Sequence, residues 1–186
     1  MTPSFLIGLI GAFTLVAGAA YPPGENAARP MRSVKNWLFA IGGFLMLAYS
    51  TLNYMAGGVI FFVILQIFIN STSVLMMLNV RDAVDIPVIT TVGTAMVAWS
   101  LYLFEGMNTA IFVLGLSVLG LGYALEMGTV RRNVCLAVGS GAVCLFSYIA
   151  GDMIFFWLNL FFALFSGYYA IRLLQRNTDP VGPVLR

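Results

Sequence analysis

The stretch "MIFFWLNLFFALFSGYYAIRLL", residues 153–174, contains a single charged residue, Arg172, close to its end. A helix that crosses a bilayer needs about 20 mostly apolar residues, so this stretch predicts a membrane-spanning helix. Asn159 lies among its apolar and aromatic side chains. Because burying an amide without a hydrogen-bond partner costs several kcal/mol, we expect Asn159 to have a specific partner.

The composition of the whole chain agrees with this interpretation. Of its 186 residues, 61% are hydrophobic and only 9% are charged, and the mean hydropathy is +0.97. Soluble domains carry about 25% charged residues, so the composition indicates a helical membrane protein with several spans. The chain has no histidine, which excludes a histidine metal site. It has no phosphate-binding loop or zinc-ligand spacing either, and we expect no metal and no cofactor.

Seven apolar stretches are long enough to be spans. They cover residues 4–21, 34–54, 58–78, 87–104, 108–126, 133–150 and 153–174. Very short connections, with room for little more than a turn, join the second span to the third, the fourth to the fifth and the sixth to the seventh. The remaining connections are longer. The sequence therefore predicts an all-α membrane protein with seven transmembrane helices.

The basic residues fall on one side of the predicted membrane. All nine lysines and arginines lie opposite the very short connections, which carry only Glu105 and Asp152. Because cytoplasmic loops are enriched in lysine and arginine, we expect the N-terminus outside and the C-terminus in the cytoplasm. The short loops favour a bacterial inner membrane. A net charge of +2 gives no reason to expect a nucleic-acid partner.

Two parts of the chain resemble each other. "NWLFAIGGFLMLAYS", residues 36–50, matches "NVCLAVGSGAVCLFS", residues 133–147, at an asparagine, an alanine, a glycine and a serine. After a turn that is three residues shorter in the second copy, "VIFFV" at 59–63 matches "MIFFW" at 153–157. The pattern predicts two parallel three-helix units, a linker helix between them and a polar tail. The first unit is 1–78, the linker 79–106, the second unit 107–175 and the tail 176–186.

This three-one-three plan resembles the SWEET/PQ-loop transporter superfamily, whose N-terminus also lies outside. Pro22 and Pro23 stand where the family's first helix ends in a Pro-Gln pair, and the glutamine is missing here. "LAYS", residues 47–50, is similar to the aromatic-plus-small ending of the second helix. Asp152 and Asn159 in "GDMIFFWLN" resemble the third helix, whose asparagine lines the solute pocket. In that family the first-helix proline is a hinge, so the resemblance implies a hinge at Pro22 and Pro23. The residue type itself favours a simpler role, in which the two prolines end the first span.

Polar and aromatic residues inside the spans are the candidates for a solute site. Asn159 and Gln66 hold nearly corresponding places in the two units, and amides cost more to bury than hydroxyls. Tyr49 and Phe146 match each other in the repeat and could supply flat walls for a solute. The predicted substrate-binding residues are Asn159, Gln66, Tyr49, Phe146, Asn70 and Ser147.

Packing between helices is the alternative role for the polar residues. Serine, asparagine and glutamine side chains hydrogen-bond across helix contacts in membranes. For Ser147 packing is the commoner role, and Asn70 lies further along its helix, where it suits a packing contact. For Asn159 and Gln66 solute binding and packing are equally open.

No acidic or basic residue lies near the middle of a predicted span. Carboxylates inside a membrane mark proton and cation relays, so their absence favours passive movement of a neutral solute. The spans also lack a set of acid, base and nucleophile, which argues against an enzyme. The resemblance implies a facilitative transporter that moves a sugar or another small neutral polar solute by alternating access.

Two other functions stay open. One is a vitamin or nucleoside carrier, similar to the nicotinamide riboside (Pnu-type) transporters, which share the three-one-three plan. The other is a receptor or structural membrane subunit that uses the same fold and transports nothing. The expected partners are a small-molecule solute and the lipid bilayer, and the sequence is also compatible with a homo-oligomer.

Overall fold

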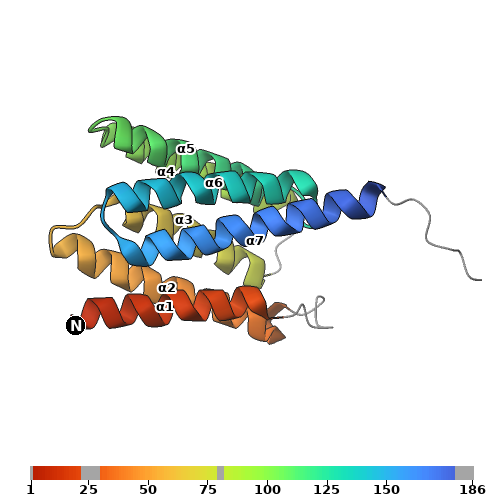
Figure 1. The fold of residues 1–186 in the computed structure, drawn as a ribbon, viewed down its shortest axis with the longest axis horizontal. Helices are drawn as coiled ribbons and strands as arrows, with labels where there is room; N and C mark the ends of the chain where they lie inside the picture. Colours follow the sequence, from red (N-terminus) through yellow and green to blue (C-terminus); the bar gives the residue numbers. More distant parts are fainter. Residues whose placement is uncertain (1, 22–29, 79–81, 179–186) are drawn as a thin grey trace, which may run out of the picture.

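The computed structural model describes residues 2–21, 30–78 and 82–178. Within these ranges the chain forms α-helices and one short 3-10 turn, and no strand (Figure 1). The helices are α1 (Pro3–Ala20), α2 (Val34–Met55), α3 (Phe61–Leu78), α4 (Asp82–Tyr102), α5 (Met107–Ala124), α6 (Val130–Ile149) and α7 (Met153–Thr178), and the 3-10 turn is η1 (Pro30–Arg32). The predicted all-α class is therefore confirmed for the described residues.

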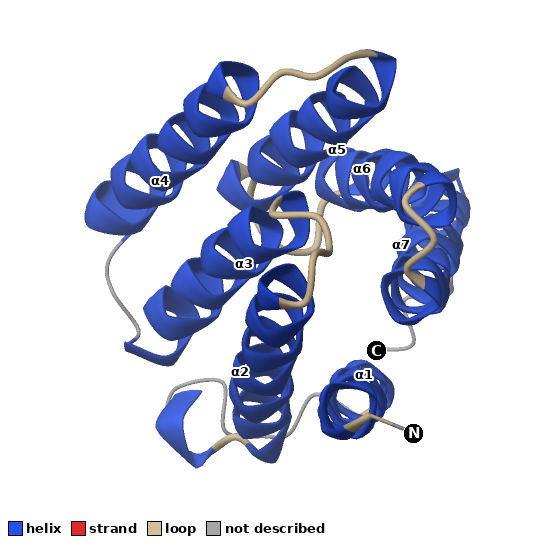
Figure 2. Cartoon of the chain, turned by 90° about the vertical axis from the view of Figure 1, so that its left-hand side faces the viewer, coloured by secondary structure: helices blue, strands red, loops and turns tan. Residues whose placement is uncertain are grey.

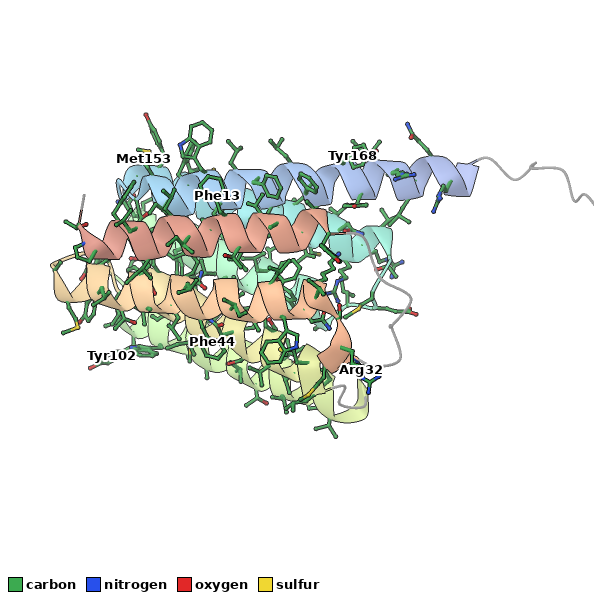
Figure 3. The ribbon with its side chains drawn as sticks, turned by 90° about the horizontal axis from the view of Figure 1, so that it is seen from below. Phe13, Arg32, Phe44, Tyr102, Met153 and Tyr168 are labelled. Carbon is green, nitrogen blue, oxygen red and sulfur yellow. The ribbon has the colours of Figure 1, made fainter. Side chains whose placement is uncertain are left out.

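The lengths and surfaces of the helices support an integral membrane protein. Six of the described helices are long and apolar enough to cross a bilayer. The remaining helix, α3, is also mostly apolar along its 18 residues. Large apolar side chains face outward around the bundle, as Phe13, Phe44 and Tyr168 do in Figure 3. Lipid covers such a surface without cost, because acyl chains are as apolar as these side chains.

Two helix boundaries differ from the prediction by more than three residues. The fourth span was expected to start at Pro87, but α4 begins at Asp82 and has Pro87 inside it. Proline has no N–H to donate, so one carbonyl in the preceding turn of α4 lacks its helical partner. Helix α7 continues to Thr178, past the expected end at residue 174 and into the predicted polar tail.

Two of the short turns are built alike. Gly57 between α2 and α3 and Gly151 between α6 and α7 have left-handed φ angles of +95° and +74°. The residue after each glycine donates its backbone N–H to the carbonyl five residues earlier, which is the Schellman helix ending. These bonds join Gly58 to Asn53 at 2.9 Å and Asp152 to Ser147 at 3.0 Å. We name the end of the molecule that carries the α2–α3, α4–α5 and α6–α7 connections the turn end.

The opposite end carries the described basic residues, and we name it the basic end. Figure 3 shows Arg32 there, with Tyr102 and Met153 at the turn end. The described lysines and arginines are Arg32, Lys35, Arg131, Arg132, Arg172 and Arg176. They lie in η1, in the first turn of α2 or α6, or near the end of α7. The one-sided charge that the sequence predicted is therefore present in the described part of the chain.

Seen along the helices, six of them form a ring and α4 lies outside it (Figure 2). Each helix contacts its neighbours in the sequence, and α1 also contacts α7 while α3 also contacts α5. Helix α4 contacts α3 and α5 from the outside. The order around the ring is therefore α1, α2, α3, α5, α6 and α7.

Glycines let α1 and α2 approach closely. A Cβ atom added at Gly42 would lie 2.9 Å from the backbone nitrogen of Leu15 and 3.0 Å from the carbonyl oxygen of Gly11. Real Cβ atoms do not come this close to backbone atoms, so only glycine fits at position 42. Small residues at helix contacts are the usual means of close packing inside a membrane.

The pair α5 and α6 repeats this contact. A Cβ atom added at Gly139 would lie 2.8 Å from the backbone nitrogen of Leu119 and 3.0 Å from the carbonyl oxygen of Gly115. The same residue types, at the same helical spacing, therefore form a close contact in both helix pairs.

Candidate functional site

Six aromatic side chains fill the interior of the ring near the turn end. Phe62 and Phe155 stack, with their ring centroids 4.3 Å apart and their planes 9° apart. Phe146 packs against Phe61, Phe62 and Phe112, with ring centroids 5.0 to 5.8 Å apart. Such ring pairs add to the free energy gained from burial alone. The aromatic cluster consists of Tyr49, Phe61, Phe62, Phe112, Phe146 and Phe155, which are all buried and come from five helices.

A buried hydrogen-bond cluster lies beside these rings. The Tyr49 hydroxyl donates to Oδ2 of Asp152 at 2.9 Å, and Nδ2 of Asn53 donates to the same oxygen at 3.1 Å. The other carboxylate oxygen, Oδ1, accepts the backbone N–H of Phe155 at 3.1 Å and so caps α7. We name Tyr49, Asn53 and Asp152 the latch, because they tie α2 to the turn between α6 and α7.

The carboxyl group of the latch is held largely out of water. Asp152 is 6% exposed, and this burial raises its pKa above the ordinary value of 3.8. The hydrogen bonds from Phe155, Tyr49 and Asn53 act in the opposite direction, because they favour the charged form. Burial is the larger of the two effects, so the buried carboxyl group holds its proton more tightly than an exposed one does.

The latch was missed in the sequence, where Asp152 was placed in an outer turn and Tyr49 was assigned only to solute packing. A usable signal was present in the comparison of the two turns. Asp152 occupies the position that Gly58 has in the α2–α3 turn, so the second unit carries a carboxyl group that the first unit lacks.

The two predicted amides lie one helical turn beyond the stacked rings. Gln66 follows Phe62 by four residues in α3, and Asn159 follows Phe155 by four residues in α7. Four residues are about one turn and about 6 Å of rise, so each amide lies on the same helix face as its ring. Both helices start at the turn end, and both amides are buried. The two amides therefore lie at one level, inward of the aromatic cluster.

These two amides differ in their hydrogen bonds. Nδ2 of Asn159 donates to the carbonyl of Phe155 at 2.8 Å, within α7. Oε1 of Gln66 is buried and accepts no hydrogen bond, and the whole side chain is only 1% exposed. A buried polar atom without a partner is rare in folded proteins and calls for an explanation.

Asn70 joins α3 to α2. Its Nδ2 donates to the carbonyl of Gly43 at 3.1 Å and to the carbonyl of Gln66 at 2.8 Å. Its Oδ1 occupies the space where any residue other than glycine at position 43 would have its Cβ atom, only 2.6 Å away. These contacts favour the packing alternative for Asn70.

We expect Asn70→Ala to lower the free energy of unfolding by about 1–3 kcal/mol, because two carbonyls lose their donor and a gap opens beside Gly43. Thermal unfolding of the purified protein in detergent measures this change. Asn108→Ala is the control, because Asn108 is exposed in the first turn of α5. Equal stability of both variants and the wild type would contradict the role of Asn70 as a lock between helices.

The other predicted site residues have local roles in the structure or lie outside it. The Ser147 hydroxyl donates to the carbonyl of Val143 at 2.7 Å and is inaccessible, which agrees with packing. Phe146 belongs to the aromatic cluster. The predicted hinge residues Pro22 and Pro23 lie outside the described residues.

Two of the pockets among the described residues lie beside the ring. The first, about 360 Å³, lies at the turn end, and Glu105, Phe61 and Phe146 are among the residues that line it. The second, about 320 Å³, runs between α4 and α5. Neither pocket includes Gln66 or Asn159. The two amides are enclosed, because Gln66 is 1% exposed and Asn159 is 6% exposed.

The site thus consists of two enclosed amides below an aromatic cluster, with a latch at the turn end. Amides can bind a polar molecule through hydrogen bonds, and they offer no nucleophile. In the described part of the chain, no three His, Cys, Asp or Glu side chains lie close enough together to hold a metal ion. Comparison with known protein families, curated proteins and solved structures finds no match for this chain.

Proposed function

We propose that the protein is a facilitative transporter that moves a sugar or another small neutral polar solute by alternating access. The solute binds between two three-helix units, α1–α3 and α5–α7, and α4 links them. One observation carries the proposal: Gln66 and Asn159 lie buried at one level of an apolar bundle, and the Gln66 oxygen has no partner. In an apolar interior, such an atom favours a polar occupant.

The helix contacts support two related units. Exchanging α1, α2 and α3 for α5, α6 and α7 turns every contact of the ring into another contact of the ring. The α1–α2 pair becomes α5–α6, α2–α3 becomes α6–α7, and α1–α7 becomes α5–α3. The matched glycine contacts and the matched turns follow the same exchange. Parallel repeats with the solute site between them are a known transporter plan.

The latch and the aromatic cluster suit a closed end in an alternating-access cycle. Tyr49 and Asn53 belong to the first unit and Asp152 to the second, so the latch bonds one unit to the other. The Phe62–Phe155 stack also joins the two units. Opening the turn end requires both contacts to separate.

In this proposal the turn end faces outside and the basic end faces the cytoplasm, as in a bacterial inner membrane. The described basic residues lie at the basic end, and Glu105 and Asp152 lie at the turn end. Cytoplasmic ends of membrane proteins are enriched in lysine and arginine.

Uptake into proteoliposomes tests the proposal. We expect the purified full chain to take up a labelled sugar or another neutral polar solute down its gradient, without an added ion gradient. We expect Asn159→Ala and Gln66→Ala each to reduce uptake about tenfold, because each removes a hydrogen bond to the solute. Trp157→Leu is the control, because Trp157 lies two residues from Asn159 and is 64% exposed on the lipid side.

Wild-type uptake by both amide variants would contradict the assigned site. Uptake of no solute by the wild type, together with stable co-purification of other protein chains, would favour the structural-subunit alternative.

A further inference from the structure

Helix α7 extends past its neighbours at the basic end (Figure 1 and Figure 3). Its partner α6 ends at Ile149 and α7 begins at Met153, so the two helices are level at the turn end. Helix α6 has 20 residues and α7 has 26. At a rise of 1.5 Å per residue, α7 therefore continues about 9 Å beyond the start of α6.

The uncharged part of α7 has the length of a bilayer interior. Residues 153–171 contain no acidic or basic side chain. They span about 28 Å at 1.5 Å per residue, and the hydrocarbon core of a bilayer is about 30 Å thick. Arg172 therefore lies at the edge of the hydrocarbon. Arg176, about 6 Å further along the helix axis, lies in the layer of lipid headgroups.

A tyrosine and two arginines form a row on the outer surface of this part of α7. Tyr168, Arg172 and Arg176 follow one another at intervals of four residues, so they lie on one side of the helix. All three side chains are exposed, and Tyr168 points away from the bundle in Figure 3. Neither arginine makes a hydrogen bond or an ion pair with the part of the chain that the structure describes. Their N–H groups can therefore bind an acceptor from outside the protein.

The surface around this row is positively charged. The described residues of η1, α1, α2, α6 and α7 include no aspartate or glutamate. At the basic end, the described acidic residues are Asp82 and Asp85 in α4 and Glu126 between α5 and α6. Helix α7 contacts α1 and α6, and it contacts neither α4 nor α5. The charge of this surface therefore complements an anion.

We propose that Tyr168, Arg172 and Arg176 form a binding site for the phosphate group of an anionic phospholipid. A guanidinium group donates two parallel hydrogen bonds to phosphate oxygens, and it is always charged. Tyr168 lies one turn closer to the hydrocarbon, where a tyrosine ring packs against the start of the acyl chains. The exposed side chain of Ile171 adds apolar surface beside Arg172. A lipid satisfies both the charged and the apolar part of this surface, whereas a soluble anion satisfies only the charged part.

The site lies on the outer surface of α7, away from the proposed solute path, so its occupancy does not depend on transport. Anionic lipids give the cytoplasmic leaflet its negative surface potential. With the basic end in the cytoplasm, the two arginines would lie in that leaflet.

A lipid titration tests the site. Phosphatidylglycerol is added to the purified full chain in an uncharged detergent, and the midpoint of thermal unfolding is measured. We expect the midpoint to rise, because a ligand that binds the folded state stabilises it. The same amounts of phosphatidylcholine, which has no net charge, should have a much smaller effect. Glycerol phosphate and inorganic phosphate should have no effect at these concentrations, because neither carries acyl chains.

The double variant Arg172→Gln/Arg176→Gln should need about 25-fold more phosphatidylglycerol for half of the shift, because each arginine near anionic lipid contributes a factor of about five. Arg32→Gln/Lys35→Gln is the matched control. It removes the same charge at the same end, from η1 and α2, which do not contact α7. We expect the control to change the titration much less. Equal midpoints of both variants and the wild type without added lipid would show that all three fold alike.

Four results would overturn the inference. Equal shifts with phosphatidylglycerol and phosphatidylcholine would show that the charge of the lipid has no role. An equal shift with inorganic phosphate would assign the surface to a soluble anion. Equal weakening in the two double variants would indicate a diffuse attraction of the whole basic end to anionic lipid. A wild-type titration of Arg172→Gln/Arg176→Gln would show that the lipid binds elsewhere.

Discussion

Gly139→Val is expected to leave little folded protein, whereas Gly141→Val, two residues away in α6, is expected to fold normally. A Cβ atom at position 139 would lie 2.8 Å from the backbone nitrogen of Leu119, and α5 would have to move away as a whole. A Cβ atom at position 141 has nothing within 4 Å. Overpacking usually costs about 1–3 kcal/mol, and valine against backbone belongs at or above the upper end of that range. Folded yield and thermal unfolding in detergent measure the difference.

Gly42→Val tests the same contact in the other unit. Its Cβ atom would lie 2.9 Å from the backbone nitrogen of Leu15, so we expect a loss of stability similar to that of Gly139→Val. Two similar losses support matched packing in the two helix pairs. If Gly42→Val or Gly139→Val is as stable as Gly141→Val, the helices of that pair are not in close contact and the glycine argument is wrong.

Much of the fold could be predicted from the sequence, because a helix that crosses a bilayer must be apolar and of a minimum length. Apolar runs of span length predicted all seven helices, with most ends within a few residues. The prediction that a helix starts at Pro87 is wrong. Proline is common in the first turn of helices, and this preference does not show whether a helix has already begun before the proline. The order of helices around the ring was not accessible, because hydropathy shows which residues face lipid only on average, and not which helix lies beside which.

The candidate site was accessible only in part. Asn159 and Gln66 stood out because an amide in an apolar run is costly, and that cost is visible in the sequence. The latch did not stand out, because a carboxyl group in a turn is usually exposed and its burial depends on the approach of α2 from the other unit. In the structure Gly8 makes room for the ring of Tyr49, because a Cβ atom at position 8 would lie 2.7 Å from Cγ of Tyr49.

The stability of the protein is expected to fall as the pH rises above 3.8, because burial raises the pKa of Asp152 above that ordinary value. A group that holds its proton more tightly in the folded state stabilises that state below its unfolded pKa. This contribution is lost as the pH rises through the folded pKa. Each unit of difference between the two pKa values corresponds to about 1.4 kcal/mol. We call the pH range over which this stabilisation is lost the window. It begins near pH 3.8 and ends at the raised pKa of Asp152 in the folded protein.

Asp152→Asn removes the titrating group and keeps a side-chain oxygen for the end of α7. Thermal unfolding of both proteins in detergent across the acidic and neutral range measures the effect. The unfolding midpoint of Asp152→Asn should rise relative to that of the wild type as the pH rises through the window. Above the window the difference between the two midpoints should be constant. A difference that does not change with pH, or that moves in favour of the wild type, would contradict the burial of this carboxyl group.

Tyr49→Phe is expected to extend the window to higher pH. The Tyr49 hydroxyl bonds to Asp152 and lowers the pKa of that carboxyl group, so its loss raises the pKa further. Where the carboxylate is charged, the free energy of unfolding of the variant should also fall by about 1.5–3 kcal/mol, the usual contribution of a hydrogen bond to a charged group. Tyr148→Phe is the control, because Tyr148 is 61% exposed near the same turn. If the pH profiles of Tyr49→Phe and Tyr148→Phe coincide, the hydroxyl of Tyr49 does not bond to Asp152 and Tyr49 is not part of the latch.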